Sequence, residues 1–311
     1  MEVRVELNMN HRISTKREPR LEVQMSWWGM NGLGVQNGAG DEWGMEEKVV
    51  RIAEAGYDGI NGFLPEGREA ERLFRLLDQY NLSYSVNAYP KTAEELDVFL
   101  RKAKSFGRVD FVNVQVIRPF LVGEQAMQLL ADMAEVSHSV GIPAYIETHR
   151  GTVTQDLLRT VEYAQALPEL KLTIDFSHYV VAGEMTTVSD EAEELLQTLL
   201  SRTKSIHARV SNGEQVQIDI PMLGNVDVES AKDLEFEHPM LKHYKRWWLV
   251  GMRSWRQTAL ANEVLPFVCE LGPPPYAITV RGPEDVACEV SDRWTQALLF
   301  ARIARSLWEQ V

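Results

Sequence analysis

Eight short apolar runs, most of them followed by a stretch with helical periodicity, constrain the fold of this 311-residue chain more than any other feature. Several runs are nearly continuous in Val, Ile, Leu and Phe, which is typical of parallel strands buried on both faces. Consecutive runs begin roughly 30 residues apart, the length of one strand–helix unit. The expected strands are 21–28, 57–63, 82–88, 109–117, 142–148, 170–176, 204–210 and 264–271.

Eight strand–helix units predict an α/β fold, a closed (β/α)₈ TIM barrel, more readily than an open sheet. An insertion at 211–240, rich in Glu, Asp, Pro and Asn, separates strands seven and eight and precedes a helical stretch at 241–260. We therefore predict a single catalytic domain over 21–311. Residues 1–20 form an N-terminal arm or a short strand in this prediction, because apolar and charged residues alternate there. The other expected helices are 45–55, 69–80, 93–106, 124–140, 190–201 and 292–309.

The charge balance excludes some classes of partner. Lys and Arg total 32 against 45 Asp and Glu, a net charge of −13, whereas nucleic-acid binding usually needs a basic face. No apolar run approaches the ~18 residues of a membrane span, and the charged first residues are unlike a signal peptide. With only two cysteines, we expect a cytoplasmic protein that binds neither nucleic acid nor membrane. We also expect a homo-oligomer.

Four neighbouring strands each end in a ligand-type side chain. Glu147, Asp175, His207 and Glu270 follow apolar residues of strands five to eight, where the chemistry of such a barrel is found. Four such groups converging on one point would mostly repel one another, and a divalent cation between them is the simplest solution. Buried ion pairs in a metal-free barrel are the alternative. The mainly oxygen donor set suits Mn²⁺, which we expect first, and Mg²⁺ or Co²⁺, and it is less specific for Zn²⁺.

Three further polar residues stand beside this set. Strand periodicity places His149 on the face of Glu147, and Arg209 on the face of His207. His178 lies three residues past Asp175, in the expected loop. We assign substrate binding to His149, His178 and Arg209, although core histidines and an arginine that neutralises a carboxylate are the plainer alternatives.

These strand ends resemble the xylose-isomerase-like TIM barrels, the sugar phosphate isomerase/epimerase group that also includes ketose 3-epimerases and endonuclease IV. The D-x-x-H pattern of Asp175 and His178 and the E-x-G-P pattern at Glu270 carry the resemblance, with Glu147, His207 and the 53–60 segment AEAGYDGI. The resemblance implies that Glu147, Asp175, His207 and Glu270 bind one metal ion. It also implies that the two glutamates are the catalytic acid/base pair, and that His178 and Arg209 hold the substrate.

The sequence departs from this group at two places. Asn61 stands on strand two, where many members carry Glu, and the segment after Arg209 does not match the ketohexose epimerases. The nuclease branch is disfavoured, because strands three and four offer Asn87, Asn113 and Gln115 in place of extra histidines, and no D-x-H follows His207.

The sequence predicts a divalent-metal-dependent sugar isomerase or epimerase. Its substrate would be a ketose or a ketose-like small molecule, and the reaction would begin with proton abstraction next to the carbonyl and pass through an enediolate. A lyase or dehydratase acting on a keto-sugar or 3-keto-glycoside at the same site is one alternative. A non-catalytic scaffold subunit stabilised by the metal is another. The glycine-rich segment at 29–44 is expected to be an active-site lid rather than a phosphate cradle.

Overall fold

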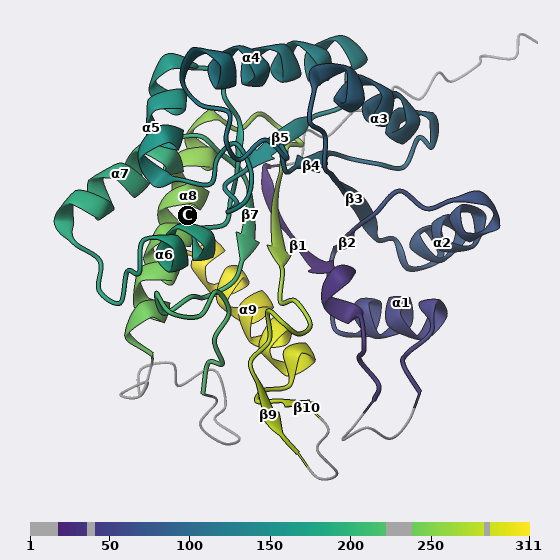
Figure 1. The fold of residues 1–311 in the computed structure, drawn as a ribbon. Helices are drawn as coiled ribbons and strands as arrows, with labels where there is room; N and C mark the ends of the chain where they lie inside the picture. Colours follow the sequence, from purple (N-terminus) through teal and green to yellow (C-terminus); the bar gives the residue numbers. More distant parts are fainter. Residues whose placement is uncertain (1–17, 36–40, 222–237, 283–286) are drawn as a thin grey trace, which may run out of the picture.

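All eight predicted strands form, and they close into one parallel barrel in chain order (Figure 1). The structure, a computed structural model, describes residues 18–35, 41–221, 238–282 and 287–311. It confirms the predicted α/β TIM barrel. The strands are β1 (Arg20–Ser26), β2 (Gly59–Gly62), β3 (Ser83–Ala88), β4 (Val112–Val114), β5 (Ala144–Glu147), β6 (Leu172–Ile174), β7 (Thr203–Ala208) and β8 (Val264–Cys269).

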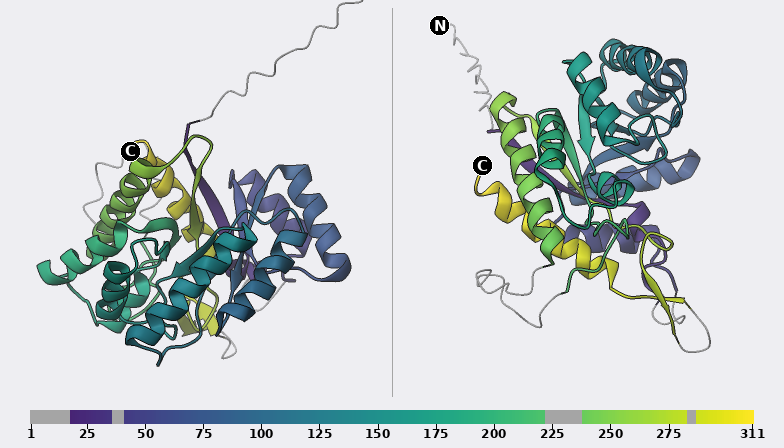
Figure 2. Two further views of the ribbon diagram at one scale, coloured as in Figure 1. Left: turned by 90° about the horizontal axis from the view of Figure 1, so that it is seen from above. Right: turned by 60° about the vertical axis from the view of Figure 1, so that its left-hand side comes forward.

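Helices surround the barrel on its outer side (Figures 1 and 2). Each of the longer ones carries an apolar stripe of buried residues. The helices are α1 (Met45–Glu54), α2 (Gly67–Tyr80), α3 (Ala93–Ser105), α4 (Gly123–Val140), α5 (Leu157–Ala166), α6 (Ser177–Ala182), α7 (Asp190–Leu200), α8 (Pro239–Thr258) and α9 (Arg293–Trp308). A 3-10 turn, η1 (Trp28–Met30), follows β1, and a hairpin of β9 (Thr279–Arg281) and β10 (Ala287–Glu289) follows β8.

The strands alternate between apolar and polar side chains, and this alternation divides the core in two. In β1, Val23 and Met25 are buried apolar residues, whereas Gln24 between them hydrogen-bonds to Ser85 of β3. Similar polar side chains on β2, β4 and β5 are also buried. Because successive strand residues point to opposite faces, the apolar set faces the helices and the polar set lines the barrel interior. The polar interior is what the functional site is built on.

The structure differs from the sequence prediction in detail. Helices α5 and α6 and the β9–β10 hairpin were not expected, and His178, expected in a loop, lies in α6. Most of the 1–20 arm, the centre of the 211–240 insertion and part of the glycine-rich segment lie outside the described residues. Within the described ranges, no helix has the length and apolar content that crossing a membrane would require.

Candidate metal centre

The four predicted ligands lie at the carboxyl ends of four neighbouring strands. Glu147 is the last residue of β5, His207 is the penultimate residue of β7, and Asp175 and Glu270 each come directly after β6 and β8. All four side chains are buried. Because adjacent parallel strands end at the same rim of the barrel, residues 123 positions apart along the chain meet there.

Glu147, His207 and Glu270 form one compact donor group. One ligand atom from each of them lies within 4.8 Å of the other two. His207 Nδ1 lies 3.0 Å from Glu270 Oε2 and 3.8 Å from Glu147 Oε1. Glu147 Oε1 and His207 Nε2 are buried without a hydrogen-bond partner. Buried polar atoms are normally satisfied, so these unpartnered atoms and the mixed oxygen–nitrogen donor set fit a divalent cation.

Asp175 lies next to this group rather than within it. Its Oδ1 accepts hydrogen bonds from the backbone N–H and the hydroxyl of Ser177, at 2.9 and 2.6 Å. Its Oδ2 has no hydrogen-bond partner and lies 3.5 Å from both Arg209 Nη2 and His178 Nε2. Its role as a fourth ligand therefore stays a prediction.

Arg209 is buried against Glu270, and its positive charge neutralises that carboxylate. The guanidinium donates to Glu270 Oε2 at 2.7 Å and to the Glu270 carbonyl oxygen at 3.0 Å. It also lies over the rings of Tyr276 and Trp28, with 4.7 and 5.8 Å between Cζ and the ring centroids. Arg209 thus fixes the orientation of Glu270, and contact with a substrate stays a prediction.

Glu147 is held by two amide side chains that the sequence alone did not single out as functional. Asn113 Nδ2 and Gln115 Nε2 both donate to Glu147 Oε2, at 2.5 and 2.8 Å. Both hydrogen bonds therefore reach the same carboxylate oxygen, Oε2, and the other oxygen, Oε1, faces His207. The signal in the sequence is the alternation of polar residues in an otherwise apolar strand, which by itself does not identify their hydrogen-bond partner.

A chain of buried hydrogen bonds continues from Asn113 through the barrel. Asn113 also donates to Asn87, and Asn87 donates to Asn61. Asn61 donates to the Ser85 hydroxyl, which in turn donates to Gln24. Asn61, at which this sequence departs from the group it resembles, is therefore an internal member of an amide network.

Burial and charge act in opposite directions on the ionisable groups of the site. Burial disfavours the charged form of Glu270, but the charges of His207 and Arg209 outweigh it and lower the pKa of Glu270 to about 2. Burial also disfavours protonated His207, but the carboxylates of Glu270 and Glu147 raise its pKa to about 9. Burial raises the pKa of Asp175 to about 6 and that of Glu147 above its usual range.

His149 and His178, on the β5–β6 side of the site, have lowered pKa values, in contrast to His207. Burial and the charge of Arg209 lower the pKa of His149 to about 4, and burial and nearby cationic groups lower that of His178. Their rings pack together, with centroids 3.7 Å apart. The structure therefore brings His149, His178 and Glu147 together, as strand periodicity predicted for the first of them.

The E-x-G-P segment after β8 is held in place by hydrogen bonds from the insertion between β7 and α8. Gln217 exchanges two hydrogen bonds with the backbone of Gly272, at 2.8 and 3.1 Å. A Cβ at Gly272 would collide with the ring of Trp28, so only glycine fits this close approach. The described part of the insertion thus contributes to the position of Glu270.

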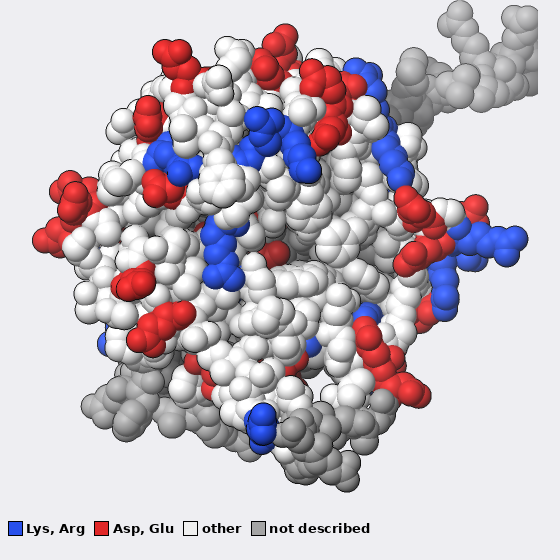
Figure 3. Space-filling view, viewed as in Figure 1, with Lys and Arg blue, Asp and Glu red and all other residues white. Residues whose placement is uncertain are grey.

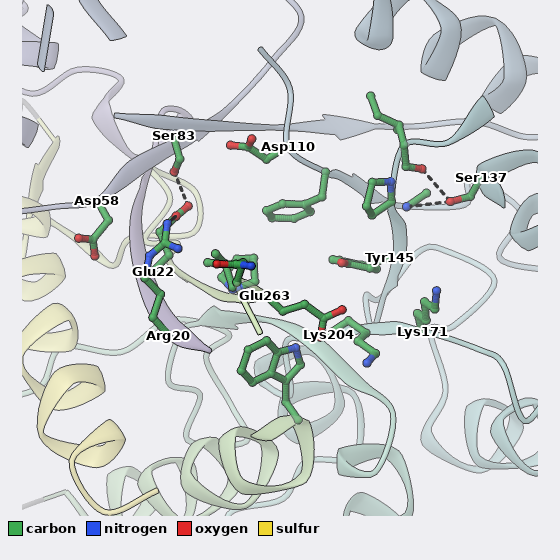
Figure 4. A pocket seen from close by; sticks show the side chains of 18 of the residues that line it. Arg20, Glu22, Asp58, Ser83, Asp110, Ser137, Tyr145, Lys171, Lys204 and Glu263 are labelled. Atoms are coloured by element: carbon green, nitrogen blue, oxygen red, sulfur yellow. Dashed lines mark hydrogen bonds and ion pairs between the residues drawn. The ribbon is translucent and has the colours of Figure 1, made fainter. Parts of the chain in front are cut away.

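A cavity of about 1420 Å³ lies at the other end of the barrel (Figure 4). Residues at the amino ends of the strands line it, among them Glu22, whose carboxylate accepts a hydrogen bond from Gln24 and so continues the amide network. The donor group of Glu147, His207 and Glu270 includes no residue of this cavity. Side chains at this end of a barrel usually serve stability, so we place the chemistry at the opposite end.

No family model matches the sequence. No curated protein matches it. Among solved structures, an AP endonuclease of family 2 from Brucella melitensis has 15% identity and a TM-score of 0.50, over 82% of this chain and 94% of that one. An endonuclease IV from Thermus thermophilus has 14% identity and a TM-score of 0.44, over 94% of this chain and 100% of that one.

A xylose isomerase domain protein from Planctomyces limnophilus has 10% identity and a TM-score of 0.48, over 95% and 99% of the two chains. At such identities the Brucella match shows a shared fold and no more. The fold implied by the xylose-isomerase-like resemblance is therefore confirmed.

Proposed function

We propose that this chain is a divalent-metal-dependent sugar isomerase or epimerase that acts on a ketose or ketose-like substrate. The observation that supports it best is the pairing of Glu147 and Glu270 in one donor group, with carboxylate oxygens 3.8 and 3.0 Å from the same atom, His207 Nδ1. A bound divalent ion would supply Lewis-acid polarisation of a substrate carbonyl. Glu147, His207 and Glu270 would hold it, with Asp175 as the expected fourth ligand.

The two glutamates have different environments, which suits a division of proton transfer. The raised pKa of Glu147 makes it the more basic carboxylate, and the lowered pKa of Glu270 keeps it ionised. In the proposed reaction, one glutamate removes the proton from the carbon beside the carbonyl and the other returns a proton to the opposite face. Arg209 and the Asn113–Gln115 pair hold these carboxylates in place.

The test is proton exchange in D₂O. Metal-loaded protein is incubated with a panel of ketoses and 3-keto-glycosides and the products are followed by NMR. Deuterium incorporation with inversion beside the carbonyl identifies an epimerase, and aldose formation identifies an isomerase. Loss of water or of an aglycone would instead establish the lyase alternative. If no carbon–hydrogen bond exchanges in any sugar, although metal removal lowers stability, the proposal is wrong and the scaffold alternative holds.

A further inference from the structure

A second group of donor atoms lies beside the metal centre. Glu147, His149 and His178 place one ligand atom each within 4.8 Å of the others. His178 is fully buried, and its Nδ1 has no hydrogen-bond partner. Two imidazoles and a carboxylate would bind a second cation. A free N–H of His178 would instead donate to an anion, whereas the N–H of His149, at Nδ1, already donates to the carbonyl oxygen of Arg150. The charges around the two histidines decide between these ligands.

Two guanidinium groups and the ring of His178 lie around the ring of Tyr276. The Cζ atoms of Arg209 and Arg150 lie 4.7 and 5.3 Å from the ring centroid of Tyr276, and the His178 ring lies 6.4 Å from the same centroid. Arg209 Nη1 lies 3.5 Å from His178 Nε2. The carboxylates of Glu147 and Asp175 also adjoin the histidines, with Asp175 Oδ2 3.5 Å from His178 Nε2, and the two fixed positive charges offset their attraction for a second cation. The geometry therefore favours an anionic ligand.

Arg150 is available for such a ligand. Arg209 is already paired with Glu270, but Arg150 has no ion pair with any carboxylate in the part of the chain that the structure describes. Figure 3 shows basic side chains beside a recess near the middle of this face, with an acidic group visible inside it.

The turn that carries Arg150 is fixed by its own hydroxyl groups. Thr152 Oγ1 donates to the carbonyl oxygen of His149 at 2.7 Å, and Thr154 Oγ1 donates to that of Glu147. The hydroxyl of Tyr179, in α6, donates to the Thr154 carbonyl oxygen at 2.9 Å. This network holds the segment after β5 in one conformation, so binding an anion there costs little ordering of the backbone.

We propose that Arg150 and His178 form a subsite for an oxyanion, and that the substrate of the metal centre carries such a group, either a phosphate ester or a carboxylate. That the anion belongs to the substrate rests on the proposed function, whereas the subsite itself does not. The subsite adjoins Glu147, so a sugar bound at the metal centre would direct its anionic group toward the β5–β6 side. Arg150 then discriminates charged from neutral ketoses.

Binding of inorganic phosphate to the metal-free protein tests the subsite without turnover. With chelator present, calorimetric titration should show one saturable site per chain. Arg150→Gln should weaken it ~10-fold or more, because a charge-assisted hydrogen bond is lost. Arg101→Gln removes the same charge from an exposed arginine of α3 and should change nothing. Titration with acetate in parallel distinguishes the sources: tighter phosphate binding indicates a phosphate ester, and tighter acetate binding indicates a carboxylate.

Two results would overturn the subsite. One is the absence of saturable binding of either anion, or equal weakening by Arg150→Gln and Arg101→Gln. The other is a Mn²⁺ titration that shows two ions per chain, one of which is lost in His149→Ala, since that identifies a second metal site. Phosphate binding in a protein that exchanges no sugar proton leaves the subsite standing and contradicts only the proposed function.

Discussion

The side-chain amide of Asn113 donates to Oε2 of Glu147 across 2.5 Å, and this one contact settles which carboxylate oxygen can face the other ligands. Gln115 donates to the same oxygen. The opposite oxygen, Oε1, is buried and without a hydrogen bond, 3.8 Å from His207 Nδ1. Asn113 is itself oriented by Asn87, so the position of Glu147 depends on hydrogen bonds that begin deep in the barrel.

The first prediction concerns the hydrogen bond by which Gln115 holds Glu147. Gln115→Leu should lower Mn²⁺ affinity ~10–100-fold, because groups that orient a metal ligand typically contribute that much. Gln128→Leu is the matched control: Gln128 also donates to a carboxylate, but on the exposed face of α4. Calorimetry or the amplitude of the free Mn²⁺ EPR signal measures both. Equal affinity in the two variants would show that Glu147 is positioned without Gln115.

The second prediction is a pH dependence of the metal-free protein. The pKa of His207 is raised from about 6.5 in an unfolded chain to about 9 in the fold. Since the folded-state value is the higher one, protonated His207 stabilises the fold fully below pH ~6.5, and this contribution is lost as the pH rises through 9. It amounts to something on the order of 3 kcal/mol in the free energy of unfolding. Asp175, with a pKa of about 6, titrates below this window.

Denaturant unfolding in EDTA, at several pH values between 6 and 9.5, measures how steeply the free energy of unfolding falls as the pH rises. His207→Gln should remove most of this slope while lowering stability at pH 6. Apparent Mn²⁺ affinity should rise over the same interval, because the metal must displace the His207 proton. A wild-type slope that persists in the variant would mean that another group is responsible.

The sequence was sufficient for the barrel and for the placement of Glu147, Asp175, His207 and Glu270 at its strand ends, because both follow from strand periodicity. Helix α6 has only six residues, too few for a helical period to be read, so His178 was placed in a loop. The sequence does not predict the contacts of Asn113 and Gln115 with Glu147, because they depend on the register of β4 and β5, which pairs Val114 with Ile146. No local pattern encodes register between strands so far apart in the chain.

Arg150 was missed for a related reason. It follows His149 directly, and strand alternation would point it away from the site. The chain leaves β5 at Glu147 and turns at Gly151, which has a φ of +76°, so alternation no longer applies at Arg150. The direction of a side chain in such a turn depends on tertiary contacts, here with the ring of Tyr276.

The third prediction concerns nucleic acid. With a net charge of −13 and no additional histidines at the ends of β2 to β4, the protein should not incise a duplex that contains an abasic site. The measurement is gel analysis of an end-labelled duplex with Mn²⁺- or Zn²⁺-loaded protein. Incision by the wild type that disappears in Glu270→Gln would show that the nuclease branch was wrongly set aside.

The fourth prediction separates metal ligands from acid/base groups. Asp175 is the expected fourth ligand and has no acid/base role in the proposed reaction, so Asp175→Asn should act mainly through weaker metal affinity, and excess Mn²⁺ should partly restore turnover. Glu147→Gln and Glu270→Gln keep an oxygen that can ligate, but the amide cannot accept a proton as a base. Loss of a positioned general base typically lowers rates ~10²–10⁴-fold, so both should stay inactive when saturated with metal.

The measurements are turnover and the uptake of solvent deuterium into the substrate, for the three variants across a Mn²⁺ titration. Because Glu147 has the raised pKa and Glu270 the lowered one, the two glutamate variants should also differ from each other. One of them should still exchange the substrate hydrogen with solvent without inversion, since the remaining carboxylate can remove a proton and return one to the same face. If excess metal rescues both glutamate variants as well as it rescues Asp175→Asn, then the glutamates are only ligands and the two-base mechanism is wrong.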